Sequence, residues 1–121
     1  MPSLGLAHRH LTGVTVIMVC GEMDATNRGQ IERYLSEARR APSDAVVFDL
    51  SQVPFMDSSG LHVLLTCATD CLRHGGAIHL AAVQRLPARL FEITGVVAHI
   101  PIHETVDDAV AAALAPFKRS L

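Results

Sequence analysis

Three short runs of apolar residues constrain the fold of this chain most strongly. They cover residues 14–20, 45–50 and 77–83, and each is nearly continuous in apolar residues. Such runs are typical of strands that are buried on both faces, because a strand with one face in water alternates apolar and polar residues. The segments between them carry apolar residues at helical spacing. The alternation predicts an α/β sandwich with a mostly parallel, mixed β-sheet and right-handed crossovers.

The remaining elements complete this prediction. Residues 4–11 alternate in part and predict an antiparallel edge strand, which a Thr12-Gly13 turn joins to the first buried run. Residues 96–102 predict a last short strand. About four helices are expected. Their predicted limits are Asp24 or Thr26 as N-cap and Pro42 as stop, then Asp57 to Gly75-Gly76, then Pro87 to Gly95, and finally a helix capped by Thr105 with apolar positions up to Phe117.

Composition narrows the class of protein. The chain has 121 residues, of which 50% are hydrophobic and 18% charged, so we expect one domain over residues 1–121. A net charge of -2 and 4% aromatic residues argue against binding to nucleic acid. No apolar stretch is long enough to span a membrane, and no leader is evident. Three cysteines do not form a disulfide framework, which favours a cytoplasmic protein.

Two polar segments follow buried strands and define the candidate site. These are Gly21-Glu22-Met23-Asp24 and Phe55-Met56-Asp57-Ser58-Ser59-Gly60. Ligands and partners of an open parallel sheet gather at the carboxyl ends of its strands, where both segments are expected. We therefore expect the two segments to lie together.

The Asp57-Ser58-Ser59-Gly60 turn has two interpretations. In the first it is a helix cap, in which Asp57 or Ser58 accepts hydrogen bonds from free amides and Gly60 allows close approach of a neighbour. In the second, a serine hydroxyl at a helix N-terminus is a place where the fold tolerates a phosphate. A partner packed against the same turn would not tolerate that charge, because it would have to be desolvated.

The residues around this turn resemble a known family. The segment Val46-Val-Phe-Asp-Leu-Ser-Gln-Val-Pro-Phe-Met-Asp-Ser-Ser-Gly-Leu61 is similar to the core of the bacterial anti-sigma-factor antagonists, which are STAS-domain proteins. The 21–24 turn and residues 89–96 look like two further patches of that family in the same order. The resemblance implies a STAS-like fold for the chain from about Leu11 to Phe117.

The resemblance also implies a partner-switching function in transcription regulation. Ser58, or alternatively Ser59, would be phosphorylated by an anti-sigma-factor serine kinase of the histidine-kinase-like ATPase fold. The unphosphorylated protein would bind that anti-sigma factor and release its sigma factor, and a serine phosphatase would restore this form. We expect the partner to contact a surface around Ser58 that has an apolar rim of Met23, Phe55, Met56 and Leu61, together with Asp24, Asp57, Ser59 and His62.

Two other functions are alternatives to this one. A STAS scaffold or sensor module in a larger signalling assembly would use the same surface without phosphorylation. A serine hydrolase would use Ser58 as nucleophile with His62, His79 or His99 as base. The turn lacks the Gly-x-Ser-x-Gly pattern of an esterase, so we expect no catalytic residues and no cofactor.

The cysteines raise the question of a metal or redox site. Cys67, Cys71 and His74 follow one another at positions i, i+4 and i+7 of a predicted helix. This spacing would suit soft metal ligands or a redox pair. The two cysteines flank the apolar stripe of the same helix, which favours core packing and no metal site. Cys20 lies inside an apolar strand and is also expected in the core.

Overall fold

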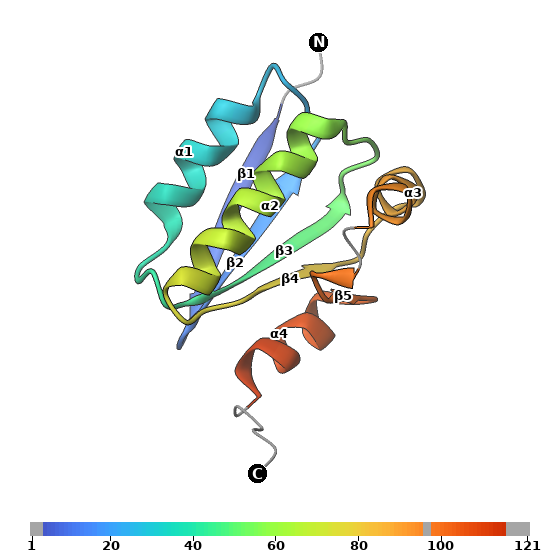
Figure 1. Ribbon diagram of the computed structural model, residues 1–121. Helices are drawn as coiled ribbons and strands as arrows, with labels where there is room; N and C mark the ends of the chain where they lie inside the picture. The colour runs from blue at the N-terminus through green and yellow to red at the C-terminus, as the bar shows by residue number, and fades with distance from the viewer. Residues whose placement is uncertain (1–3, 96–97, 116–121) are drawn as a thin grey trace.

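The computed structural model describes residues 4–95 and 98–115 of the chain. Within these residues the sheet has five strands in the order β1-β2-β3-β4-β5 (Figure 1). The edge strand β1 pairs antiparallel with β2, and all other pairs are parallel. The strands are β1 (Gly5–Leu11), β2 (Val14–Cys20), β3 (Ala45–Gln52), β4 (Ile78–Ala81) and β5 (Ile102–His103). The predicted mixed sheet with an antiparallel edge is confirmed.

In the described part of the chain, four helices pack around the sheet. They are α1 (Arg28–Ala38), α2 (Ser58–Arg73), α3 (Arg85–Thr94) and α4 (Val106–Leu114). Helices α1 and α2 lie side by side over one face of the sheet, whereas α4 packs on β2, β3 and β4 from the other face (Figure 1). The core is accordingly divided into two clusters, a large one under α1 and α2 and a small one under α4.

The alternation along β2 shows how the two clusters arise. Ile17 and Val19 belong to the large cluster, and Val14 and Val16 belong to the small one. The prediction that Cys20 lies in the core is wrong, since its side chain is exposed. Cys20 shares the α4 face with Val14 and Val16, but α4 has nine residues and leaves the end of the strand uncovered. Met18, on the same face, is 42% exposed for the same reason.

Other predicted boundaries need correction. The N-cap position of helix α1 is Asn27, whose side chain makes no capping hydrogen bond, and not Asp24 or Thr26. The Asp24 carboxylate instead accepts from the amide and hydroxyl of Thr26. The last strand is shorter than residues 96–102 suggested. Among the described residues beyond Gly95, the Ala98 amide donates to the Gly95 carbonyl, and only Ile102 and His103 pair with β4. Val96, Val97 and Phe117 lie outside the described residues.

Candidate functional site: two loops and the first turn of α2

Two loops meet at the carboxyl ends of β2 and β3. We call residues 21–24 and 53–57 the loop pair. The Met23 amide donates to the Phe55 carbonyl at 3.1 Å, and the Asp57 amide donates to the Met23 carbonyl at 3.1 Å. Met23 and Met56 thereby form an isolated parallel bridge beyond the ends of the strands. The expectation that the two polar segments lie together is confirmed, and backbone hydrogen bonds hold them in register.

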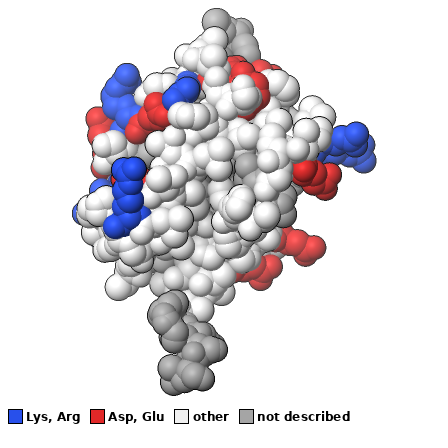
Figure 2. Space-filling view, in the orientation of Figure 1, with Lys and Arg blue, Asp and Glu red and all other residues white. Residues whose placement is uncertain are grey.

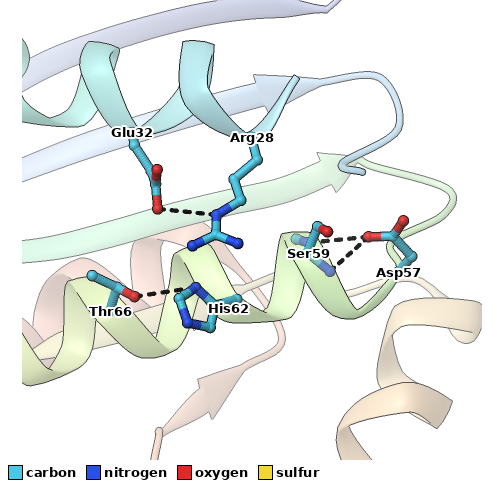
Figure 3. Close-up of polar contacts among 7 residues, drawn as sticks. Arg28, Glu32, Asp57, Ser59, His62 and Thr66 are labelled. Atoms are coloured by element: carbon cyan, nitrogen blue, oxygen red, sulfur yellow. Dashed lines mark hydrogen bonds and ion pairs between the residues drawn. The ribbon is translucent and has the colours of Figure 1, made fainter. Parts of the chain in front are cut away.

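Asp57 caps the helix that follows the loop pair. One of its carboxylate oxygens accepts from the Ser59 amide at 2.8 Å and from the Gly60 amide at 3.2 Å (Figure 3). These are two of the amides that have no partner within a helix, so the cap satisfies them. The capping interpretation of Asp57 is confirmed. Ser58 is thereby the first residue of α2 without having to serve as its cap.

Ser58 is exposed at this position. Within residues 4–95 and 98–115, its hydroxyl takes part in no side-chain hydrogen bond. Ser59, the next residue, is half-buried. A serine that is exposed, unpaired and placed at a helix N-terminus is accessible to a modifying enzyme, and the helix dipole there favours a negative charge.

Gly60 brings α2 against the loop pair. A Cβ at this position would lie 2.5 Å from Cγ of Met56, 2.8 Å from Cβ of Met23 and 2.9 Å from the Met23 carbonyl oxygen. The backbone oxygen cannot move without breaking the bridge between the loops, so a side chain is excluded. The first turn of α2, with Ser58 on its outer side, is fixed to the loops through this contact.

The predicted apolar rim is largely wrong. Met23 is 0% exposed, Met56 is 4% exposed and Leu61 is 7% exposed, so all three side chains belong to the core. They face inward because the bridge and the contact at Gly60 pull both loops against the helix. Phe55 alone of the four is outside, with 41% of its surface exposed. The polar members of the predicted surface are half-buried or exposed, namely Asp24, Asp57, Ser59 and His62.

Two charged residues near the site were missed by the sequence analysis. Arg28 and Glu32 lie one turn apart on α1, and Nε of Arg28 is 3.4 Å from a Glu32 carboxylate oxygen. Figure 3 shows Arg28 directed toward the first turns of α2, where Ser59 and His62 lie. The spacing of an Arg and a Glu four residues apart was a visible signal of a solvated helix face, but only the packing of α1 on α2 places them beside this site.

A groove runs between α1 and α2 from this point. It has a volume of about 760 Å³, with Glu32 and Ser36 on one side and His62 and Thr66 on the other. Leu35, Val63 and Cys67 also line it. His62 Nδ1 lies 3.5 Å from the Thr66 hydroxyl, on its own helix. In Figure 2 the charged side chains lie around the left, upper and right margins of this view, and a broad central area is free of Lys, Arg, Asp and Glu.

The residues considered for catalysis or metal binding are dispersed. His79 on β4 pairs with His103 on β5, their ring nitrogens 3.0 Å apart. His99 is exposed in the turn before β5. Cys67 and Cys71 are buried in the large core cluster, which is the core position that their sequence context favoured. The ring of His74 contacts the backbone carbonyl of Asp70. The described residues contain no group of three or more His, Cys, Asp or Glu side chains suited to holding a metal ion.

Comparison with known proteins identifies the fold family. The model of the STAS domain matches residues 6–109, and the chain belongs to this family. An anti-sigma F factor antagonist of Paenibacillus polymyxa is 28% identical over 103 residues, covering 84% of this chain and 88% of that protein. The anti-sigma-F factor antagonist RsfA of Mycobacterium tuberculosis is 27% identical over 106 residues, covering 86% and 83%.

Solved structures agree with this assignment. The crystal structure of an anti-sigma factor antagonist from Mycobacterium paratuberculosis superposes with a TM-score of 0.83 at 28% identity, covering 93% of this chain and 96% of that one. The anti-sigma factor antagonist SpoIIAA in its unphosphorylated form gives a TM-score of 0.75 at 20% identity, covering 89% and 95%, and shares the fold. In the part of the chain that the structure describes, no helix is both long and apolar enough to cross a bilayer.

Proposed function

We propose that this protein is an anti-sigma-factor antagonist that phosphorylation of Ser58 switches off. In this proposal the unphosphorylated form binds an anti-sigma factor, which then releases its sigma factor. The observation that carries the proposal is the exposed Ser58 hydroxyl at the start of α2, on a turn fixed by Asp57 and Gly60. The support from relatives is that two proteins of nearly the same length are anti-sigma F factor antagonists.

The electrostatics of the turn favour such a switch. A phosphate adds about -1.5 to -2 charges. Asp57 already occupies the Ser59 and Gly60 amides, so a phosphate on Ser58 would project outward from the surface. The fold of the free protein would tolerate it, since Ser58 is exposed and lies at the positive end of the helix dipole. A partner covering Ser58 would have to bury the phosphate, at a cost far above that of an exposed contact.

The contact surface in this proposal differs from the one first predicted. Its apolar contribution comes from Phe55, and its polar contributions come from Asp24, Ser59 and His62 around Ser58. Met23, Met56 and Leu61 support the surface from beneath. The partner in this proposal is an anti-sigma factor with serine kinase activity of the histidine-kinase-like ATPase fold, and a serine phosphatase reverses the modification.

The test compares two substitutions at Ser58. Ser58→Ala and Ser58→Glu are titrated with the purified anti-sigma factor, and wild-type protein is incubated with ATP and that kinase before phosphate mapping by mass spectrometry. We expect phosphate on Ser58, and an affinity for Ser58→Glu at least about tenfold below that of Ser58→Ala, which corresponds to 1.4 kcal/mol. Thr69→Glu is the matched control, because Thr69 is an exposed residue of the same helix, well removed from the loop pair.

Each other result has a defined meaning. Equal affinities of the two Ser58 variants would contradict the electrostatic mechanism. An unmodified wild-type protein that still binds its partner would support the scaffold or sensor alternative. Phosphate on Ser59 with Ser58 unmodified would show that Ser59, and not Ser58, is the regulatory phosphorylation site. Ester hydrolysis that disappears in Ser58→Ala would support an enzyme, which the position of His62 does not favour, since its ring contacts Thr66.

A further inference from the structure

Cys67 and Cys71 form a thiol pair that the proposed switch does not use. They lie one turn apart on the same side of α2, within the large core cluster. Cys71 is 0% exposed, whereas Cys67 is 6% exposed and lines the groove between α1 and α2. A small solute in the groove can therefore reach the pair through Cys67.

A charged side chain, that of Arg39, lines the same groove as Cys67. Arg39, at the end of α1, donates from Nη1 to a carboxylate oxygen of Asp70 at 2.6 Å and from Nη2 to the Pro42 carbonyl. The guanidinium side chain is only 11% exposed. Its Nε is buried and finds no hydrogen-bond partner within the described part of the chain. Asp70 pairs with a different nitrogen of the guanidinium, so Nε stays an unsatisfied buried donor that a further negative charge on the thiol pair would stabilise.

The pKa values of the two thiols are consistent with a negative charge on the pair. A hydrogen bond from Cys67 and the charge of Arg39 lower the pKa of Cys71 to about 7, against the opposing effect of burial. The same hydrogen bond and burial raise the pKa of Cys67. Of the other groups around the pair, Asp70 opposes the thiolate and His74 favours it slightly. The two sulfurs thus behave as one unit that shares a proton and is partly deprotonated near neutral pH.

We propose that Cys67 and Cys71 are a reversible oxidation site, which a hydroperoxide entering the groove converts into a disulfide within α2. Cys67, which lines the groove, passes its proton to Cys71 and attacks one peroxide oxygen. The O–O bond breaks, and a sulfenic acid at Cys67 forms together with hydroxide, or with alkoxide where the peroxide is organic. The remaining thiol then attacks the sulfenic sulfur, the S–S bond forms, and its proton leaves with the hydroxyl group as water. The two thiols supply the two electrons that reduce the peroxide, and an added dithiol reverses the reaction.

Helix geometry sets the character of this disulfide. Residues four apart on a helix have Cβ atoms about 5–6 Å apart, whereas a relaxed disulfide needs about 3.8 Å. Forming the bond therefore requires α2 to distort between residues 67 and 71. A strained disulfide is reduced more readily than a relaxed one, as expected of a reversible site and not of a permanent structural bond.

The experiment uses the full chain with the exposed Cys20 as internal reference. Wild-type and Cys20→Ser proteins are treated with hydrogen peroxide, denatured, alkylated and mapped by mass spectrometry. We expect the peptide that contains both Cys67 and Cys71 to lose two hydrogens, to resist alkylation at both positions and to recover with dithiothreitol. If both thiols of the pair still alkylate fully once Cys20 of the wild type has been oxidised, the proposal is wrong.

A second measurement tests the role of Arg39. Removing its charge in Arg39→Met should lower the oxidation rate of the pair at pH 7 by about tenfold, because the thiolate fraction falls. Arg39→Lys keeps the charge and should retain most of the rate. Circular dichroism checks that each variant is folded. If Arg39→Met does not fold, iodoacetamide labelling of the Cys20→Ser protein across pH replaces it, and labelling that begins only above pH 8.5 would overturn the proposal. Equal rates for folded Arg39→Met and wild type would do the same.

Discussion

Gly60 is the point at which the helix that carries Ser58 touches the loop pair. We expect Gly60→Ala to destabilise the protein by about 1–3 kcal/mol, because the new methyl group would overlap the Met23 carbonyl and the Met56 side chain. Chemical denaturation measures the free energy of unfolding. A variant as stable as the wild type would show that the loops are not held as tightly as the bridge between Met23 and Met56 indicates.

Gly29 provides the matched control for this substitution. It also lies in a helix, α1, but a Cβ there would meet nothing within 4 Å. Gly29→Ala should therefore stabilise the protein by about 0.5–1 kcal/mol, since alanine loses less entropy in a helix than glycine. Opposite signs for the two glycine substitutions would separate the steric effect at Gly60 from helix propensity.

Asp57 acts on the same turn through its carboxylate. Asp57→Ala removes the acceptor for the Ser59 and Gly60 amides and should cost about 1 kcal/mol of stability. Asp57→Asn keeps an acceptor oxygen and should cost much less. Thermal unfolding of the three proteins at neutral pH measures the difference. Equal losses for the two variants would mean that the charge of Asp57, and not its capping, stabilises α2.

Helix α3 carries one apolar side chain that is buried in the core and another that is exposed to solvent. Phe91 is 0% exposed and belongs to the large core cluster, whereas Ile93, two residues later, is 75% exposed. Phe91→Ala should destabilise the protein by about 3–5 kcal/mol through the cavity it leaves. Ile93→Ala should change stability by less than about 0.5 kcal/mol. Urea denaturation checks both, and a large loss for Ile93→Ala would place this side chain in a contact that the structure does not show.

The first and last residues of a helix could be predicted where a capping side chain or a glycine at that position sets them. Thr105 caps α4 and accepts from the Asp108 amide, and Gly95 ends α3 with a positive φ of 79°, both as expected from the residues alone. The start of α1 and the length of β5 were not predictable in this way. Asp24 uses its carboxylate in a local turn, and β5 pairs with only the last two residues of β4, Leu80 and Ala81.

The stability of the whole molecule should depend on pH through a pair of histidines. His79 and His103 join β4 to β5 with ring nitrogens 3.0 Å apart, on the two strands farthest from β1. Burial and then the neighbouring His103 lower the pKa of His79 below its ordinary 6.5. The unfolded chain therefore binds a proton at this residue at a higher pH than the folded chain does. The contribution of His79 to the free energy of unfolding is therefore fully present above about pH 6.5, and it is lost as the pH falls below that value.

Thermal unfolding between pH 7.5 and pH 5.5 measures this effect. We expect the midpoint of the wild type to fall on acidification, with a contribution from His79 of at most about 1.4 kcal/mol per pH unit. His79→Gln lacks the titrating group and should show a flatter dependence over the same range. Parallel curves for the two proteins would show that other groups account for the pH dependence.

The class of fold and the place of the site followed from local patterns. Each buried strand is a nearly continuous apolar run, and the turn at residues 57–60 carries its own capping chemistry, so both are visible without knowledge of the neighbours. What faces outward at that turn was decided by tertiary contacts. From the sequence, Met23, Met56 and Leu61 are expected to form an exposed apolar rim around the turn. The bridge between the loops and the contact at Gly60 turn their side chains inward.

The same division holds for the cysteines. Their spacing alone determined that Cys67 and Cys71 share one side of a helix, because that follows from the helical period. Only the tertiary structure brought Arg39 from the end of α1 to the pair and left Cys20 uncovered beyond the reach of α4. The physical reason is that local periodicity specifies which side a residue occupies. What covers that side depends on the length and packing of elements that are distant in the sequence.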